Sequence, residues 1–145
     1  MEHDLEKLAR QGLDDFNRGD TDALRDMMDA QDYVYEESGD IRIEGREAAL
    51  DWFRQWRIAF PDLTGELLRV VVAGDTVANE IRWTGTHYGP LPESAGGAAP
   101  TGRSITMLGT IWQTYRDGKL TAERNHVDNM LVVMQLGLLP ADSSA

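Results

Sequence analysis

The residues best suited to acid–base chemistry are one histidine, one glutamate and two tyrosines. His87 ends a Gly-rich strand segment, and its imidazole has an ordinary pKa near neutrality, which suits a general base. Tyr33, Tyr35 and Glu37 alternate along a short β-prone run, so their side chains fall on one face of a strand. A tyrosine hydroxyl can donate a hydrogen bond to a developing oxyanion. His87 and Glu37 are therefore candidate bases, although a structural hydrogen bond would explain His87 equally well.

The composition excludes several other kinds of site. The sequence has no cysteine, and this rules out a disulfide, a thiolate nucleophile and a cysteine-ligated metal. The three histidines do not form a cluster in the sequence pattern, so we expect no metal site. The Gly-Gly-Ala-Ala run at 96–99 lacks the strand, helix and lysine that a phosphate-binding loop requires.

Charge and hydropathy restrict the partners. The 14 Lys and Arg residues against 25 Asp and Glu residues give a net charge of −11 at pH 7. Such a surface repels phosphate backbones and anionic lipids, so we expect neither nucleic acid nor a membrane as a partner. No apolar run approaches the ~20 residues that span a bilayer, and the charged start lacks a signal-peptide pattern. We therefore expect a cytoplasmic protein.

Apolar spacing predicts helices in the first part of the chain. The predicted helices cover residues 5–16, 24–28 and 49–60. Asp20 or Thr21 can cap the second helix, and Pro61 ends the third. Between these two helices, residues 33–35 predict a short strand that ends at the Ser38-Gly39-Asp40 turn.

After Pro61 the apolar period changes from 3.6 to 2, which is typical of strands. The predicted strands cover residues 67–73, 76–87, 102–115 and 120–127. Tight turns at 74–75 and 116–119 join them in pairs as hairpins. The segment 89–100 has no period and predicts a mobile surface loop. Residues 129–136 predict a final helix that ends at Gly137.

Helices followed by a run of antiparallel strands are typical of the α+β class. The sequence shows no repeat or linker, so we expect one domain over residues 1–145. Its ordered core should cover about 3–137, followed by a short C-terminal tail, 138–145. The bulky apolar helices must cover one face of the sheet. A long, curved antiparallel sheet with these helices on its concave face would form a cone that encloses a pocket.

Six short motifs follow one another along the chain. They are Phe60-Pro61-Asp62-Leu63, Gly74-Asp75-x-Val77, Gly85-Thr86-His87, Pro100-Thr101-Gly102-Arg103, Asp117-Gly118-Lys119 and Gln135-Leu136-Gly137. This ordered set resembles the SnoaL-like polyketide cyclases of the nuclear transport factor 2-like superfamily, over nearly the whole chain. The resemblance implies the cone-shaped fold and chemistry without a metal or organic cofactor. It also implies a homodimer that pairs through the outer sheet face, where Leu108 and Trp112 would suit an interface.

The resemblance further implies a carboxylate on the last strand, which removes a proton α to a carbonyl so that the enolate can close a ring. Matching the motifs on either side of that strand without a gap places Asn125 at this position. The family's histidine on the preceding strand likewise falls on Ile111. An amide cannot accept the proton, but it can donate a hydrogen bond to a developing oxyanion. We therefore expect Asn125 to be the oxyanion donor and His87 or Glu37 to be the base.

Strand alternation predicts which residues share the chamber with Asn125 and which face away. Asp128 falls on the opposite face, directly before the final helix, so we expect it to cap that helix. An apolar, aromatic chamber with few polar groups fits a flat hydrophobic ligand, although its large residues could equally be ordinary core. The predicted ligand-binding residues are Tyr33, Tyr35, Phe53, Trp56, Asn79, Ile81, Trp83, Ile105, Met107, Ile111 and Val127.

Three functions stay open at this point. The first is cofactor-independent acid–base chemistry, of the cyclase or isomerase type, on a hydrophobic polyketide-like carbonyl compound. The second is a non-catalytic ligand-binding or accessory protein that has the chamber without the acid. The third is a ketosteroid-isomerase-like proton shuttle with a tyrosine hydroxyl as the oxyanion donor. All three have a small hydrophobic ligand as the partner.

Overall fold

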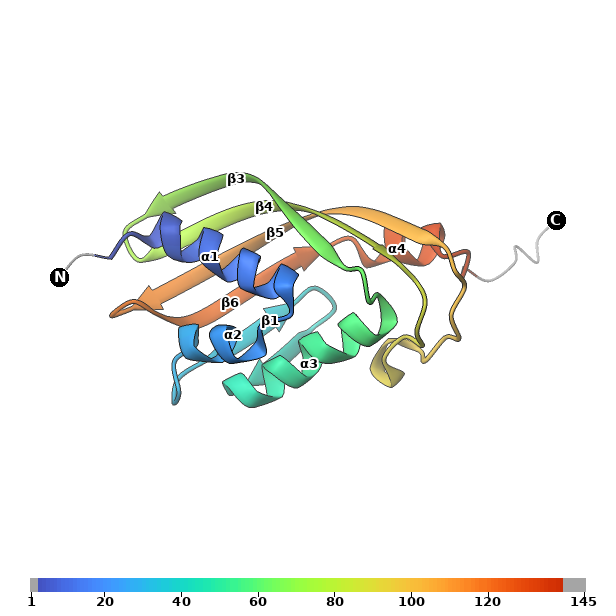
Figure 1. Cartoon of the computed structure of the whole chain (residues 1–145), viewed down its shortest axis with the longest axis horizontal. Coiled ribbons are helices and arrows are strands. Elements are labelled where there is room, and N and C mark those ends of the chain that lie inside the picture. Colours follow the sequence, from blue (N-terminus) through green and yellow to red (C-terminus); the bar gives the residue numbers. More distant parts are fainter. Residues whose placement is uncertain (1–2, 140–145) are drawn as a thin grey trace.

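Helices and strands follow one another in the order that the sequence predicts, with one additional strand (Figure 1). The computed structural model describes residues 3–139 of the chain. Its elements are α1 (Leu5–Arg18), α2 (Thr21–Met27), β1 (Val34–Glu37), β2 (Ile41–Glu44), α3 (Arg46–Ala59), β3 (Thr64–Ala73), β4 (Thr76–Thr86), the 3₁₀ helix η1 (Glu93–Ala95), β5 (Ser104–Arg116), β6 (Lys119–Val127) and α4 (Asn129–Gln135). The additional strand is β2, a four-residue edge strand that pairs with β1.

The strands form one curved sheet in the order β2-β1-β6-β5-β4-β3. The strands from β3 to β6 pair antiparallel; the β3–β4 and β5–β6 pairs are the predicted hairpins, and the long loop that contains residues 89–100 joins β4 to β5. The β1–β6 pair is parallel, so the sheet is mixed and not purely antiparallel. A hairpin forces its two strands to be antiparallel, but β1 and β6 are separated by most of the chain and are free of that constraint. Register shifts in the β3–β4 and β5–β6 pairs are bulges of the kind that bend a sheet.

Acidic side chains begin three of the helices. The carboxylate of Asp4 accepts the backbone N–H of Lys7 at 3.1 Å, and that of Asp20 accepts the N–H of Ala23 at 3.0 Å. The carboxylate of Asp128 accepts the N–H of Leu131 at 2.9 Å, so the predicted capping of α4 is confirmed. These bonds satisfy free N–H groups of the first helical turn.

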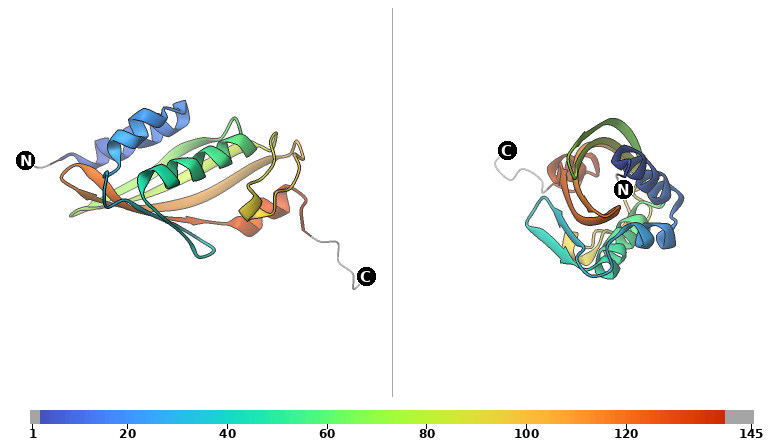
Figure 2. Two further views of the ribbon diagram at one scale, coloured as in Figure 1. Left: turned by 90° about the horizontal axis from the view of Figure 1, so that it is seen from below. Right: turned by 90° about the vertical axis from the view of Figure 1, so that its left-hand side faces the viewer.

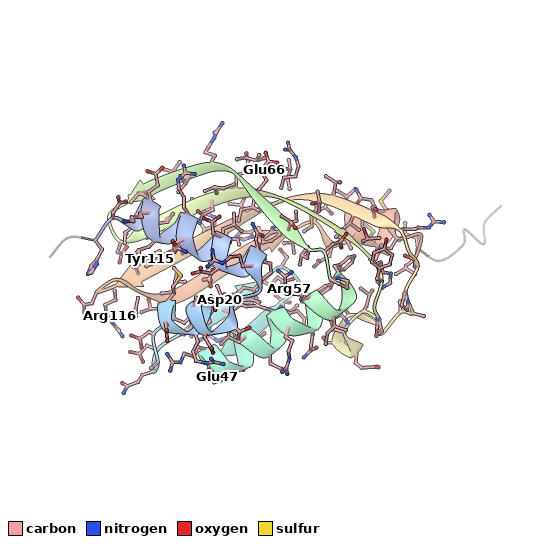
Figure 3. All side chains as sticks on the ribbon, viewed as in Figure 1. Asp20, Glu47, Arg57, Glu66, Tyr115 and Arg116 are labelled. Atoms are coloured by element: carbon pink, nitrogen blue, oxygen red, sulfur yellow. The ribbon has the colours of Figure 1, made fainter. Side chains whose placement is uncertain are left out.

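The three N-terminal helices cover the concave face of the sheet, so the predicted α+β cone is confirmed (Figures 1 and 2). Seen end-on in Figure 2, the strands and helices form a ring, and the sheet does not close on itself. Arg57 of α3 ties two of the helices together, because its guanidinium donates to the carbonyl oxygen of Phe16 at 2.7 Å (Figure 3). Tyr115 lies at the end of the molecule opposite α4, which is the narrow end of the cone (Figures 1 and 3).

Two apolar clusters hold the cone together. The larger one fills the narrow end and includes Tyr33, Trp52 and Tyr115. The smaller one lies at the wide end, where Phe60 and Leu136 are almost completely buried. Leu91 of the predicted mobile loop is also buried in this cluster, so the loop is anchored at that point. None of the helices within residues 3–139 has the length and apolar character needed to cross a membrane.

Candidate active site

A cavity of about 180 Å³ lies between the concave face of the sheet and the helices that cover it. Its wall comes from all four α-helices and from strands β1, β3, β4, β5 and β6. Side chains alternate along each strand, so every second residue of the curved sheet faces this space. Most of the wall is apolar, and the few polar groups are therefore the ones that would orient a ligand.

Strand pairing places three of the polar wall residues, together with Ile111, in a belt. The register aligns Asn79 of β4 with Ile111 of β5, Ile111 with Asn125 of β6, and Asn125 with Glu37 of β1. The belt thus crosses four neighbouring strands. The sequence-predicted residues that the structure brings together in the cavity wall are Tyr35, Glu37, Phe53, Trp56, Asn79, Ile81, Trp83, Ile105, Met107, Ile111, Asn125 and Val127.

His87, one of the two predicted bases, does not line the cavity. It is completely buried, and its ring packs against Phe60 with the ring centroids 5.5 Å apart. The backbone N–H of Thr101 donates to Nδ1 of His87 at 3.1 Å, so this nitrogen carries a lone pair and the proton belongs on Nε2. Burial also lowers the pKa of His87, which favours the neutral ring. These contacts favour a structural role.

Tyr33 also lies outside the wall, behind a carboxylate that the sequence analysis missed. Its hydroxyl donates to Oε1 of Glu123 at 2.6 Å. Gln113 donates to Oε2 of Glu123 at 3.0 Å, and Asn79 donates to Oε1 of Gln113 at 2.9 Å. Burial raises the pKa of Glu123, against the effect of these hydrogen bonds. Strand alternation could have identified Glu123 as a cavity residue, because it lies two residues before Asn125 on the same face of the strand.

Glu37 is the predicted base that does reach the cavity. Its Oε2 accepts hydrogen bonds from the Tyr35 hydroxyl at 2.8 Å and from Nε1 of Trp52 at 3.0 Å. Burial raises the pKa of Glu37, and the two hydrogen bonds only partly offset this. A carboxylate with a raised pKa is a stronger general base than an exposed one. Trp52 is not among the predicted site residues, although it precedes the predicted Trp56 by one helical turn.

Asn125 is linked to Glu37 through Tyr35. Its Nδ2 donates to the Tyr35 hydroxyl oxygen at 3.1 Å, and that hydroxyl donates to Glu37. The amide oxygen, Oδ1, is buried and has no hydrogen-bond partner among the described residues. A buried polar atom without a partner costs about 1–3 kcal/mol, so a ligand that supplies the partner gains binding energy.

Two indole N–H groups in the wall also lack a hydrogen-bond partner among the described residues. Nε1 of Trp56 and Nε1 of Trp83 are buried and find no acceptor within residues 3–139. A Cβ atom at Gly109 would lie 3.4 Å from Nε1 of Trp83, so the absence of a side chain at Gly109 makes room for this indole. The wall residues therefore include two donors and one acceptor that have no partner among the described residues. In the same part of the chain, no three His, Asp or Glu side chains are placed to hold a metal ion.

The chain is similar to proteins of known family and structure. The profile of the SnoaL-like polyketide cyclase family matches residues 7–136. No curated protein sequence matches the chain. Among solved structures, IdmH from Streptomyces antibioticus is 27% identical with a TM-score of 0.80, covering 93% of this chain and 99% of its own. AclR from Streptomyces galilaeus is 24% identical with a TM-score of 0.80 (93% and 96% covered). A SnoaL-like protein from a Jannaschia species is 23% identical with a TM-score of 0.82 (92% of each chain).

Proposed function

This chain belongs to the SnoaL-like polyketide cyclase family, and we propose that it performs cofactor-independent acid–base chemistry on a hydrophobic, polyketide-like carbonyl compound. One observation carries the proposal. The carboxylate of Glu37 is part of the wall of an apolar cavity and is joined to Asn125 by an unbroken chain of hydrogen bonds. IdmH, which has the same fold, is itself named as a candidate polyketide cyclase.

In the proposed reaction, Glu37 removes a proton α to the carbonyl of the bound compound. The C–H bond breaks, its electron pair forms the enolate, and the proton passes to the carboxylate. The enolate carbon then attacks a second carbonyl carbon of the same molecule and closes a ring; the π bond of that carbonyl breaks, and its oxygen takes the proton from Glu37. Alternatively, the enolate takes the proton back at another carbon, which isomerises the compound. Asn125 provides the hydrogen bond to the oxygen on which negative charge develops.

The position of the carboxylate supports this assignment. The family resemblance implies a carboxylate at position 125, where this chain has an amide. Glu37 is the register partner of Asn125 in the parallel β1–β6 pair, so this chain carries a carboxylate on the adjacent strand at the same level of the cone. The base and the amide would thus have exchanged strands while staying in one belt of the cavity.

Proton exchange on a small ketone tests the proposal. Tetralone, a bicyclic ketone with acidic α-protons, is incubated with the protein in D₂O, and the α-proton signal is followed by NMR. We expect Glu37→Gln to lower the protein-catalysed exchange rate by about 10²–10⁴. Glu36→Gln is the matched control, because the same change on the outer face of β1 should leave the rate unaltered. Exchange that survives Glu37→Gln would contradict the role of Glu37.

Non-catalytic binding is the second candidate, and the amide at position 125 favours it. It predicts that tetralone binds without faster exchange in the parent protein. A ketosteroid-isomerase-like shuttle would need a tyrosine hydroxyl that is free to donate. The hydroxyls of Tyr33 and Tyr35 donate to Glu123 and Glu37, so each would first have to leave its carboxylate.

Two further parts of the proposal concern the oligomeric state of the protein and its location in the cell. We place two copies in a homodimer that pairs through the outer face of the sheet, where the side chains of Leu108 and Trp112 are 55% and 48% exposed. We place the protein in the cytoplasm, on the charge and hydropathy pattern of its sequence.

A further inference from the structure

The Tyr35 hydroxyl has one proton, and its direction decides what Asn125 offers to the cavity. The hydroxyl lies 2.8 Å from Oε2 of Glu37, and because an ionised carboxylate can only accept, the hydroxyl donates this hydrogen bond. The hydroxyl oxygen is then left to accept a hydrogen bond, and Nδ2 of Asn125 supplies it at 3.1 Å. The remaining end of the amide, Oδ1, has no partner among the described residues. Asn125 therefore presents an acceptor to a ligand when Glu37 is ionised.

A proton on Glu37 reverses this chain. The free oxygen, Oε1, takes the proton, and the carboxyl group turns so that this O–H donates to the Tyr35 hydroxyl oxygen. The hydroxyl must then donate to Asn125. Only Oδ1 of the amide can accept, so the amide turns about its last side-chain bond, which exchanges O and N in place. Nδ2 then lies where Oδ1 lay. We propose that Tyr35 is a positioning residue that couples the proton on Glu37 to the donor or acceptor character of Asn125 toward the ligand.

The ligand class follows from the two states. When Glu37 is ionised, the cavity favours a compound whose hydroxyl group donates a hydrogen bond to Asn125. When Glu37 is protonated, it favours a compound that places a carbonyl or enolate oxygen at Asn125. For the reaction, which rests on the proposed function, Glu37 gains its proton at the moment when the enolate oxygen forms. The hydrogen-bond chain from Glu37 through Tyr35 to Asn125, which we call the relay, then turns the N–H groups of the Asn125 amide toward that oxygen. Proton removal and oxyanion stabilisation therefore occur together.

The surroundings of Tyr35 suit a relay. The residue is 4% exposed, and Phe53 packs edge-on against its ring at 5.0 Å between centroids. Burial raises the pKa of its hydroxyl well above the ordinary value, so the hydroxyl keeps its single proton. Trp52 of α3 donates to Oε2 of Glu37, and its N–H cannot reverse because an indole N–H only donates. The reversal is therefore confined to the bonds on either side of Tyr35.

Other titratable groups lie around Glu37. Inside the cone they are the Tyr35 hydroxyl on β1 and Glu123 on β6, and α3 and α4 contribute only the neutral Trp52 and Asn129 to the wall beside them. Outside the sheet, a second hollow includes Glu37 together with Glu36, Asp40, Arg42, Arg124 and His126. Glu36 is the carboxylate nearest in sequence, and it pairs with Arg42 and Arg124 at 3.4 and 3.5 Å. The same substitution at Glu36 therefore tests whether any pH effect comes from the outer face.

The experiment compares two probes of similar size between about pH 5 and about pH 8. Naphthol donates a hydroxyl group, whereas methyl naphthoate presents a carbonyl oxygen and has no α-proton to react. Dissociation constants are measured by quenching of tryptophan fluorescence. As pH falls and Glu37 gains its proton, we expect naphthol to bind more weakly and methyl naphthoate more tightly, each by about tenfold.

Variants show whether the relay is responsible. Tyr35→Phe should make both dissociation constants independent of pH, and so should Glu37→Gln. Glu36→Gln should keep the two opposite trends. If Tyr35→Phe does not fold, Asn125→Val serves instead, since it removes the amide and should abolish both trends. Trends of the same sign, flat titrations in the parent protein, or opposite trends that survive in Tyr35→Phe would overturn the relay. Proton exchange on tetralone is measured separately, so failure of the relay and failure of the catalytic proposal give different results.

Discussion

A buried carboxylate, Glu123, and a half-buried one, Glu37, line the same cavity, but their hydrogen bonds differ and favour different roles. Both oxygens of Glu123 accept hydrogen bonds, one from Tyr33 and one from Gln113. Glu37 accepts both of its hydrogen bonds on Oε2, and its Oε1 receives none from the described residues. Burial raises the pKa of each group. The free oxygen makes Glu37 the carboxylate that can take a proton from a ligand, whereas Glu123 holds the surrounding side chains in place.

Glu123→Gln should therefore affect stability more than chemistry. The new amide keeps only one acceptor oxygen, so either Gln113 or the Tyr33 hydroxyl loses its acceptor, and Gln113 cannot turn without losing the bond from Asn79. We expect the free energy of unfolding to fall by about 1–3 kcal/mol at neutral pH. The proton exchange rate on tetralone should change far less than in Glu37→Gln. Urea unfolding and the NMR exchange assay measure the two effects, and an unchanged stability would contradict the structural role.

The loss of unfolding free energy in Glu123→Gln should depend on pH, with a definite sign. Because the pKa of Glu123 is raised in the folded protein, the folded state holds this proton to a higher pH than the unfolded state does. Its contribution to stability is complete below the unfolded pKa and is lost as pH rises through the folded pKa. Glu123→Gln removes this term, so the difference in unfolding free energy between parent and variant should be larger at about pH 5 than at about pH 8. An equal or reversed difference would show that the pKa of Glu123 is not raised.

At the scale of elements, α4 continues the sheet where β6 ends. The last β5–β6 register pair joins Gly109 to Val127, which leaves Thr106 of β5 without a strand partner on that side. Gln135 of α4 takes this place, because its amide accepts the N–H of Thr106 at 2.9 Å and donates to its carbonyl oxygen at 3.0 Å. Asn129 and Val132 of the same helix line the cavity. The short helix thus closes the wide end of the cone.

Loss of the cap should loosen this closure. Asp128→Ala removes the acceptor for the N–H of Leu131, which we expect to cost about 0.5–2 kcal/mol of unfolding free energy. Hydrogen exchange at Leu131 should become faster, and naphthol should bind more weakly. Asp128→Asn is the matched control, since an asparagine side chain caps a helix about as well as an aspartate. Equal exchange rates in the alanine and asparagine variants would contradict the capping role.

Much of the belt can be predicted from strand alternation, and the rest depends on contacts between distant parts of the chain. The hairpin around 116–119 places Ile111 and Asn125 on neighbouring strands, but their exact pairing also depends on the register shift between Thr114 and Tyr115, which the turn does not encode. The contact of Tyr33 with Glu123 depends on the parallel β1–β6 pair, and no local turn encodes that pair. The position of His87 behind Phe60 depends in the same way on the loop that carries Thr101.

At the scale of the whole molecule, the uncovered side of the sheet combines apolar and charged residues in rows. One row runs from Val71 through Ala78 and Trp112 to Arg124 across four paired strands. Val71 and Trp112 are 54% and 48% exposed, although large apolar side chains are usually buried. With a net charge of −11 on each copy, electrostatic repulsion opposes association. Apolar contacts across this face would have to exceed that repulsion, so salt should strengthen the proposed dimer.

Trp112→Lys tests the dimer without touching the cavity. The side chain of residue 112 points away from the cavity-lining neighbours Ile111 and Gln113. We expect this substitution to raise the dissociation constant of the dimer by about 30-fold or more, as the loss of a central aromatic contact does in other interfaces. Light scattering after size exclusion should then detect monomers, while naphthol binds as tightly as before. Tyr88→Lys is the control, because Tyr88 is an aromatic residue outside the sheet and is even more exposed than Trp112. A parent protein that is monomeric at micromolar concentration would exclude the interface. A dimer that survives Trp112→Lys would place it on another face.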